Sequence, residues 1–309
     1  MAKNLVIGAV TDYEYDKIAP WLQSLKQTGY DGHIAVVAYN MSAATAAKLV
    51  EEGVTYIFGF EKDINDNFVY SNKNNTFSIM IERFAHMWYF IDKIKDEVGY
   101  VVATDVRDVI FQTNPFNFFD DEEIVSREKL LVVGTENLKY QDEPWGKNNM
   151  IQSFGPILYE YCKDTPIYCA GVIAGERRHV MDLFMNIFLL CRGAPSQVPG
   201  GGGPDQAALN IALSFEPFRK ITKFTNPEDD FVVHAGTTTY AIKSGSGDIG
   251  FSYMQDPSVL HTYEKKLLHH EPVIIDGQIC NHAGRPYSIV HQWDRVNEWR
   301  SIIEKKYGV

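Results

Sequence analysis

Two carboxylates interrupt an apolar stretch in the middle of the chain, the segment VVATDVRDVIF at 101–111. Asp105 and Asp108 stand at the end of a predicted buried strand, where carboxylates suit a hard divalent cation that prefers oxygen ligands. Residues three apart in a strand face opposite ways, so the two carboxylates converge only if the chain bends near Val106 or Arg107. The alternative is a salt-bridge cluster in which Arg107 pairs with both aspartates.

A glycine-rich segment, PGGGGPDQAALN at 199–210, leads into a predicted helix with Asp205 near its first turn. Glycines let the backbone approach a ligand closely, and a helix N-terminus favours a bound anion. A surface loop that ends in an ordinary helix cap is the other interpretation. Small residues also interrupt the predicted strand YCAGVIAG at 168–175, where they allow either the close approach of a ligand or a simple β-bulge.

Two histidines follow strand-like segments, His234 in FVVHAG and His291 in SIVHQWD. A histidine at a strand end serves either as a metal ligand or as a half-buried structural side chain. His291 is the stronger candidate for a ligand, because Gln292, Trp293 and Asp294 form a site-like cluster beside it.

The composition limits the partners that the protein can have. The formal net charge of −11 argues against nucleic acid or an anionic membrane surface, since no basic patch offsets it. The cysteines Cys162, Cys169, Cys191 and Cys280 form no C-x-x-C pair, which favours free thiols in a reducing compartment. The apolar stretches are too short for a signal peptide or an integral membrane segment, so we expect a cytoplasmic protein.

Strands and helices alternate in the predicted elements of the first sixty residues, which is typical of a mostly parallel sheet with helices on its faces. The predicted strands are 4–10, 33–39 and 54–60, and the predicted helices are 14–28 and a second one between Ser42 and Gly53. A long helix is predicted at about 76–95, with Arg83 among its apolar residues. Ligands of such sheets bind at the carboxyl ends of the strands.

The order of these motifs resembles the nucleotide-sugar glycosyltransferases of the GT-A fold. The early strand and helix units, the acid pair, AGVIAG, PDQAALN and a late IVHQ carry the resemblance, which covers roughly residues 4–295. It is closest to retaining, metal-dependent members such as glycogenin and the bacterial lipopolysaccharide galactosyltransferases. The family implies a Rossmann-like α/β fold with a mostly parallel central sheet flanked by helices and an irregular C-terminal third. No internal repeat or low-complexity linker divides the chain, so we expect one domain over 1–309, in which the resemblance implies a nucleotide-binding part at about 1–110 and an acceptor and catalytic part at about 111–309.

The resemblance further implies a metal site. In the family, a D-x-D motif and a late histidine hold Mn²⁺, or Mg²⁺, on the donor diphosphate, and these positions map onto Asp105, Asp108 and His291. This chain has D-x-x-D instead, which leaves open which aspartate binds the ion directly. His234 remains the alternative third ligand.

The same resemblance assigns the donor and the reacting sugar to particular residues. The implied donor-binding residues are Arg83, Asp105, Arg107, Ala170, Gly171 and Val172. Asp205 and Gln206 flank the reacting sugar as the implied catalytic residues, and a D-Q pair suits transfer with retention of the anomeric configuration.

These observations predict a metal-dependent glycosyltransferase that moves a sugar from a nucleoside-diphosphate donor, expected to be a UDP-sugar, to a glycan or another hydroxyl acceptor. A sugar nucleotidyltransferase is one alternative, but it normally has a glycine-rich loop after the first strand, where this chain has GAVTDYEYD. The other alternative is a non-catalytic protein that binds nucleotide sugars or carbohydrates.

Overall fold

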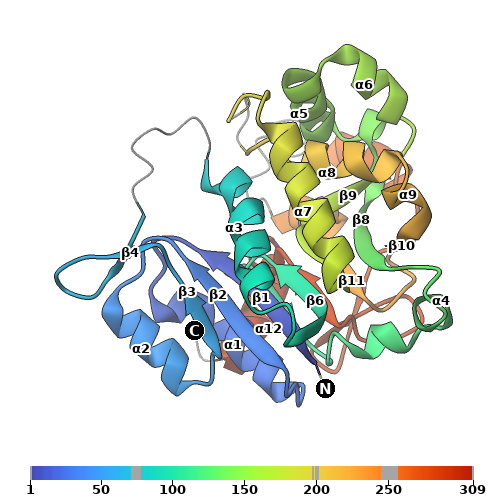
Figure 1. The fold of residues 1–309 in the computed structure, drawn as a ribbon. Coiled ribbons are helices and arrows are strands. Elements are labelled where there is room, and N and C mark those ends of the chain that lie inside the picture. The colour runs from blue at the N-terminus through green and yellow to red at the C-terminus, as the bar shows by residue number, and fades with distance from the viewer. Residues whose placement is uncertain (1, 71–77, 197, 199–201, 245–256, 308–309) are drawn as a thin grey trace.

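The computed structural model describes residues 2–70, 78–196, 198, 202–244 and 257–307 (Figure 1). Residues 199–201 of the glycine-rich segment and the predicted helical residues 76 and 77 lie outside this set. Among the described residues, no helix combines the length and the apolar character needed to cross a membrane.

A seven-stranded sheet forms the centre of the molecule, with the strands in the order β10-β8-β9-β6-β1-β2-β3. Its strands are β1 (Lys3–Val10), β2 (His33–Ala38), β3 (Tyr56–Phe58), β6 (Val98–Thr104), β8 (Leu131–Lys139), β9 (Pro166–Glu176) and β10 (Thr222–Thr225). β9 runs antiparallel to both of its neighbours, and the other adjacent pairs are parallel. The predicted α/β class with a mostly parallel central sheet flanked by helices is therefore confirmed.

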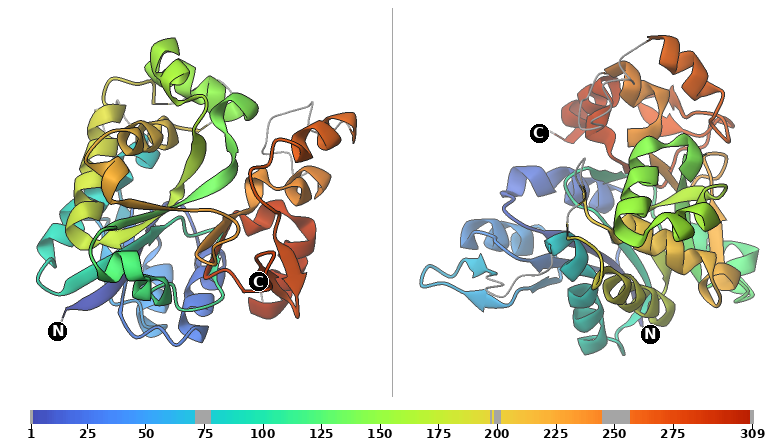
Figure 2. Two further views of the ribbon diagram at one scale, coloured as in Figure 1. Left: turned by 90° about the vertical axis from the view of Figure 1, so that its right-hand side faces the viewer. Right: turned by 90° about the horizontal axis from the view of Figure 1, so that it is seen from above.

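A second, smaller sheet of three strands joins parts of the chain that are far apart in sequence. It consists of β11 (Val232–His234), β14 (Ile289–His291) and β7 (Val109–Phe111), in that order. The other C-terminal elements are α10 (Thr239–Ser244), α11 (Pro257–Glu264), the hairpin β12 (Val273–Ile275) and β13 (Gln278–Cys280), and α12 (Asn297–Tyr307). Figure 2 shows the orange to red C-terminal elements gathered on one side of the molecule. The predicted irregular C-terminal third thus contains short, ordered elements.

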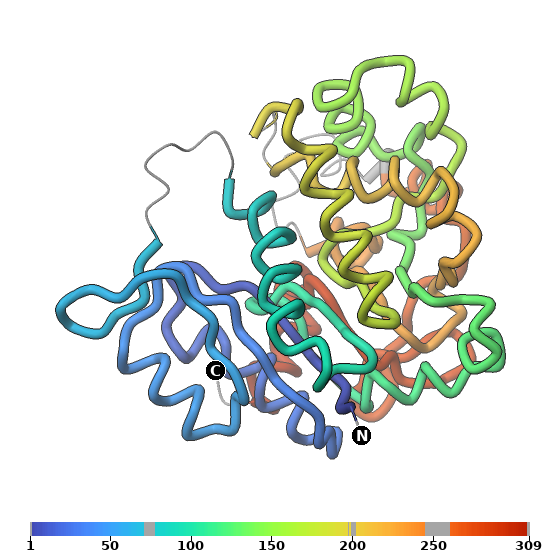
Figure 3. Tube along the Cα trace, viewed as in Figure 1, coloured from blue at the N-terminus to red at the C-terminus, as the bar shows by residue number. Residues whose placement is uncertain are grey.

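Helices cover both faces of the central sheet because its strands are apolar on both sides. Leu5 and Ile7 of β1 face α3 (Ile79–Lys93), α7 (Arg177–Cys191) and α8 (Asp205–Ser214). Val6 and Val10 face α1 (Tyr15–Gln27) and α2 (Ala43–Glu51). Figure 1 and Figure 3 show α3 and α7 side by side on the first face.

The remaining elements are short and lie around this framework. They are β4 (Glu61–Lys62), β5 (Phe68–Val69), α4 (Glu122–Val125), α5 (Pro144–Phe154), α6 (Pro156–Cys162) and α9 (Phe218–Ile221). The helix predicted between Ser42 and Gly53 is α2, and Ser42 caps it by accepting a hydrogen bond from the backbone N–H of Thr45.

The segment 101–111, which opens as one predicted strand, belongs to two different sheets. β6 ends at Thr104 in the central sheet, and β7 begins at Val109 in the small sheet. The bend predicted near Val106 or Arg107 is the connection between them, because a strand that leaves one sheet for another must turn away from its neighbours.

The strand order also creates a crevice at the end of β6. From β1, the chain builds β2 and β3 on one side and then crosses to β6 on the other side. Ligands of open α/β sheets bind at such a switch point, outside the carboxyl ends of the strands. The turn that contains the two aspartates lies at this position.

Gly8 of β1 lets the turn after β6 pack against the sheet. A β-carbon at Gly8 would overlap Cγ2 of Val106 and lie 3.2 Å from the carbonyl oxygen of Thr104. We expect Gly8→Ala to lower the free energy of unfolding by about 1–3 kcal/mol, because a well-packed core resists an added methyl group. Urea unfolding followed by circular dichroism measures this loss.

Gly99→Ala is the matched control, since a β-carbon on that β6 residue would have its nearest neighbours at 3.8 and 3.9 Å. Equal unfolding midpoints for the two variants would show that the close approach at Gly8 does not affect stability.

Candidate functional site

A cleft of about 370 Å³ opens at the carboxyl ends of β1 and β6. The sequence-predicted residues that line it are Arg83, Asp105, Arg107, Asp108, Ala170, Gly171, Asp205, Gln206 and His291. Val172 is the exception among the predicted donor-binding residues, since its side chain is packed in the core beneath the opposite face of the sheet. Ala170 and Gly171, which precede it in β9, line the cleft instead.

Two aspartates and a histidine converge at one wall of the cleft. Nε2 of His291 lies 3.5 Å from Oδ2 of Asp105 and 3.9 Å from Oδ1 of Asp108. One ligand atom of each residue lies within 4.8 Å of the others. The His291 ring is 2% exposed, and its Nε2 makes no hydrogen bond with any described residue. Two oxygens and an imidazole nitrogen at this spacing could hold a divalent cation.

Tertiary pairing places His291 beside the aspartates. In the small sheet, His291 pairs with Val109 of β7, which directly follows Asp108. The backbone N–H of Gln292 donates to the carbonyl oxygen of Asp108 at 2.7 Å. The histidine and this aspartate are therefore fixed by the same pair of strands.

Gly171 leaves the space that the histidine occupies. A β-carbon at this position of β9 would overlap Cε1 of His291 and lie 2.7 Å from its Nε2 and 3.0 Å from Oδ2 of Asp105. The carbonyl oxygen of Gly171 also accepts a hydrogen bond from the backbone N–H of Asp105 at 2.8 Å. The small residues in YCAGVIAG thus allow close approach by protein side chains, at the edge of the cleft.

Arg83 of α3 connects two carboxylates of the cleft. Its guanidinium forms an ion pair with Asp105 and another with Asp205, the latter at 3.1 Å. The Arg83 side chain is 15% exposed, which explains why this arginine stands among apolar residues in the sequence. The two ion pairs of Arg83 hold the start of α8 against the end of β6.

The two clustered aspartates differ in their electrostatic surroundings. Burial raises the pKa of Asp105, but Arg83 and His291 outweigh burial and hold it well below its ordinary value. Burial also raises the pKa of Asp108, and the neighbouring His291 offsets only part of this rise. Burial lowers the pKa of His291, yet the two carboxylates overcome this and leave it raised. A bound cation would be a second positive partner for Asp108 and would lower the pKa of its carboxyl group.

Arg107 lies at the edge of the cluster, closer to Asp294 than to Asp108. Its guanidinium lies 3.4 Å from Asp294 and 4.0 Å from Asp108, and its side chain is 43% exposed. The salt-bridge alternative derived from the sequence therefore applies mainly to Arg107 and Asp294, while Asp105 pairs with Arg83.

Asp205 and Gln206 begin α8 and also line the cleft. The backbone N–H of Ala170 donates a hydrogen bond to Oε1 of Gln206, with 3.4 Å between nitrogen and oxygen. Asn149 of α5 donates to the carbonyl oxygen of Gly203 at 2.9 Å and so ties α5 to the residues that precede α8.

Two further residues lie behind His291, on the ring edge that faces away from the aspartates. Nδ1 of His234 is 2.9 Å from Nδ1 of His291, and Sγ of Cys169 is 3.6 Å from the same atom. His234, the alternative third ligand, thus contacts His291 rather than the aspartate pair. Cys169, interpreted from the sequence only as a buried thiol, lines the cleft.

Glu136 is a functional candidate that sequence reasoning missed. It lies in β8, is 6% exposed, and interacts electrostatically with Cys169 and Gln206. Burial raises the pKa of its carboxyl group, and Cys169 and His291 offset part of that rise. Its position in VVGTENL, a carboxylate after an apolar strand, is the same signal that identified Asp105.

A scan of protein-family models and a search of curated proteins found no match to this chain. The functional assignment therefore depends on the geometry of the cleft.

Glu143 anchors the helix that forms the rim of the cleft through Trp145. Its carboxylate accepts hydrogen bonds from the backbone N–H groups of Trp145 and Gly146 at the start of α5. Burial raises the pKa of Glu143 from its usual 4.5 to about 7, despite these hydrogen bonds.

A raised carboxyl pKa makes the folded state hold a proton that the unfolded chain has already released. The free energy of unfolding should therefore fall as pH rises from about 4.5 to about 7, by up to about 3 kcal/mol. We expect Glu143→Gln to remove this part of the pH dependence, so the variant gains stability relative to the natural protein as pH rises. Urea unfolding between about pH 5 and about pH 8 measures the difference.

Glu160→Gln, on the exposed side of α6, is the control and should leave the pH profile unchanged. A constant stability difference between Glu143→Gln and the natural protein across this range would contradict the assignment.

Proposed function

We propose that the protein is a divalent-cation-dependent glycosyltransferase of the GT-A type that uses a nucleoside-diphosphate sugar, with a UDP-sugar as the expected donor. One observation carries the proposal: the cluster of Asp105, Asp108 and His291 opens onto the same cleft as Asp205 and Gln206. The cleft lies at the switch point of the sheet, where ligands of this fold class bind.

The chemistry of the cluster fits the implied ion. Nε2 of His291 is buried and makes no hydrogen bond with any described residue, and it points between the carboxylates of Asp105 and Asp108. These donors suit Mn²⁺ or Mg²⁺. When bound, the ion supplies positive charge that neutralises the diphosphate leaving group.

The protein's own residues then orient the donor and the reacting sugar. Arg83 holds Asp105 and Asp205 in fixed positions by its two ion pairs. Asp205 presents its other carboxylate oxygen to donor hydroxyl groups, and the Gln206 amide lies beside Ala170 at the sugar position. Gln206 has no basic group, so its contribution is the dipole of its amide, which stabilises positive charge on the sugar ring.

Two alternatives are separable by experiment. A nucleotidyltransferase would release pyrophosphate from a nucleoside triphosphate and a sugar phosphate, whereas a transferase with no acceptor slowly hydrolyses its donor to the nucleoside diphosphate and free sugar. A binding protein would gain thermal stability with the donor but would release neither product. The test is a panel of nucleoside-diphosphate sugars incubated with Mn²⁺ and, in parallel, with excess EDTA. Donor hydrolysis that EDTA abolishes supports the proposal, and stabilisation without hydrolysis under any condition would replace it with a binding role.

Asp108→Asn tests the metal cluster with the smallest change in shape. Asparagine keeps the volume of the side chain but removes the negative charge, so we expect Mn²⁺-dependent turnover to fall by on the order of a hundredfold. Asp105→Asn should act similarly, although it also breaks the ion pair with Arg83. Initial rates over a Mn²⁺ titration measure both effects.

Asp230→Asn is the control, because that carboxylate pairs with Arg285 on the surface. Full activity with normal Mn²⁺ dependence in both cluster variants would remove the aspartates from the metal site.

The anomeric configuration of the product tests the roles of Asp205 and Gln206. An inverting enzyme needs a base that deprotonates the attacking hydroxyl, whereas Asp205 is already paired with Arg83. We therefore expect retention: an α-linked donor should first release the α-anomer. Proton NMR in the first minutes of hydrolysis, before the anomers equilibrate, identifies it, and an initial β-anomer would make Asp205 or another carboxylate the base.

A further inference from the structure

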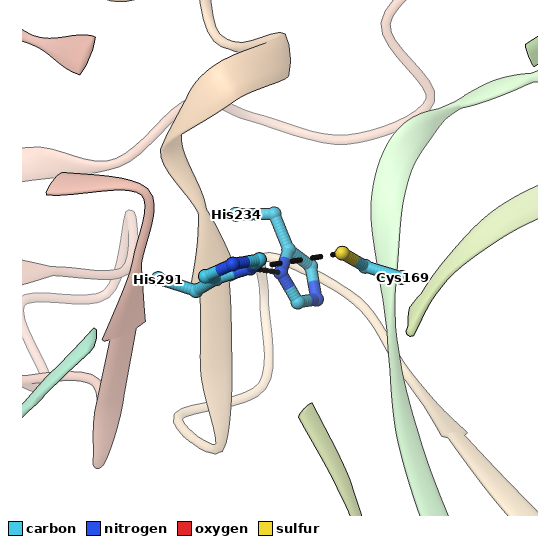
Figure 4. A group of neighbouring side chains, drawn as sticks. All are labelled: Cys169, His234 and His291. Carbon is cyan, nitrogen blue, oxygen red and sulfur yellow. Dashed lines mark hydrogen bonds between the residues drawn. The ribbon is translucent and has the colours of Figure 1, made fainter. Parts of the chain in front are cut away.

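Three side chains with soft donor atoms meet on the far side of His291 from the aspartates. Cys169 comes from β9, His234 from β11 and His291 from β14 (Figure 4). Each is buried, with 2–3% of its surface exposed. One donor atom of each lies within 4.8 Å of the other two. Three strands from two sheets therefore deliver a thiol and two imidazoles to one point.

The spacing is close to that of a tetrahedral zinc site. With Zn–N bonds of about 2.0 Å and a Zn–S bond of about 2.3 Å, tetrahedral geometry puts two nitrogens about 3.3 Å apart and a nitrogen and a sulfur about 3.5 Å apart. The Nδ1 atoms of His234 and His291 are 2.9 Å apart, and Sγ of Cys169 is 3.6 Å from Nδ1 of His291. Metal binding would move the two rings apart by a few tenths of an ångström, and the donor atoms of Cys169 and His234 lie within 4.8 Å of each other.

Polar groups flank the outer edges of both imidazoles, and neither Nε2 atom makes a hydrogen bond with a described residue. A ligating histidine donates its second N–H to a carboxylate or to a backbone carbonyl. Nε2 of His291 faces Oδ2 of Asp105 at 3.5 Å, and Nε2 of His234 lies beside the backbone of Gly134 in β8. The buried carboxyl group of Glu136 in β8 also interacts with Cys169.

We propose that Cys169, His234 and His291 form a second metal site, which binds a soft divalent cation such as Zn²⁺ through Sγ and the two Nδ1 atoms. Thiolate and imidazole ligands select such ions, whereas Asp105 and Asp108 select a hard one. The two sites share one imidazole, and a neutral imidazole has a single nitrogen without a proton. A cation on Nδ1 of His291 therefore leaves N–H at Nε2 and removes that nitrogen from the aspartate cluster.

Zn²⁺ is thus an antagonist of the hard-cation site. This consequence rests on the proposed function, but the existence of the soft site does not. The two ions compete through His291 even though they bind on opposite edges of its ring.

Cobalt titration of the full chain, freed of metal by a chelator, tests the site without any assay of activity. Tetrahedral Co²⁺ bound to a thiolate has a near-ultraviolet charge-transfer band and intense visible bands, which Zn²⁺ abolishes by displacement. We expect these bands in the natural protein and in Asp108→Asn, and we expect Cys169→Ser to lose the charge-transfer band. His234→Gln should weaken Zn²⁺ binding by at least about tenfold, since even the loss of an outer partner of a ligand has that effect.

Cys191→Ser is the matched control, because Cys191 is equally buried but lies in α7, outside the cluster. The spectrum of the natural protein decides the question even if Cys169→Ser does not fold. Absence of a thiolate band there, or its persistence in folded Cys169→Ser, would overturn the site and leave the contact between the two histidines as a hydrogen bond.

Competition is measured separately, as donor hydrolysis over a Mn²⁺ titration at fixed Zn²⁺. We expect Zn²⁺ to raise the Mn²⁺ concentration needed for half-maximal activity in the natural protein and to do so less in His234→Gln. If the thiolate spectrum is present but the protein hydrolyses no donor, the soft site stands and the proposed function fails. If hydrolysis occurs and Zn²⁺ has no effect on its Mn²⁺ dependence, the antagonism is wrong.

Discussion

The ion pairs of Arg83 are the interaction on which the cleft depends. The guanidinium joins Asp105 at the end of β6 to Asp205 at the start of α8, and all three groups are largely buried. Removing one partner from such a buried network leaves an uncompensated charge, at a cost of about 3–5 kcal/mol. The network therefore fixes α3, β6 and α8 relative to one another, and the packing of α3 against α7 and of α7 against α8 is consistent with that placement.

A second constraint comes from the way the chain leaves the central sheet. Between Thr104 and Val109 it passes from one sheet to another, and β7 then pairs with β14 from the other end of the chain. This pairing places His291 beside Asp108, while Gly171 leaves the space for its ring. The cluster thus requires three strands that are separated by long stretches of sequence.

His291 is the one residue that belongs to both groups of potential metal ligands. Its Nε2 edge faces two carboxylates, and its Nδ1 edge faces an imidazole and a thiol. The ring is buried where strands of two sheets meet. The tautomer of His291 therefore depends on which edge faces the stronger electrostatic partner.

The sequence by itself determined the features that depend on neighbouring residues. Hydrophobic periodicity placed the first strands and helices, Ser42 marked the start of α2, and the separation of Asp105 and Asp108 required a bend. Only the tertiary structure decided which distant groups meet. The pairing of β11 with β14 put His234 against His291, burial turned Val172 away from the cleft, and the layer of α3 brought Arg83 to Asp205. Strand order and register set these contacts, and they depend on packing across the whole sheet rather than on any local pattern.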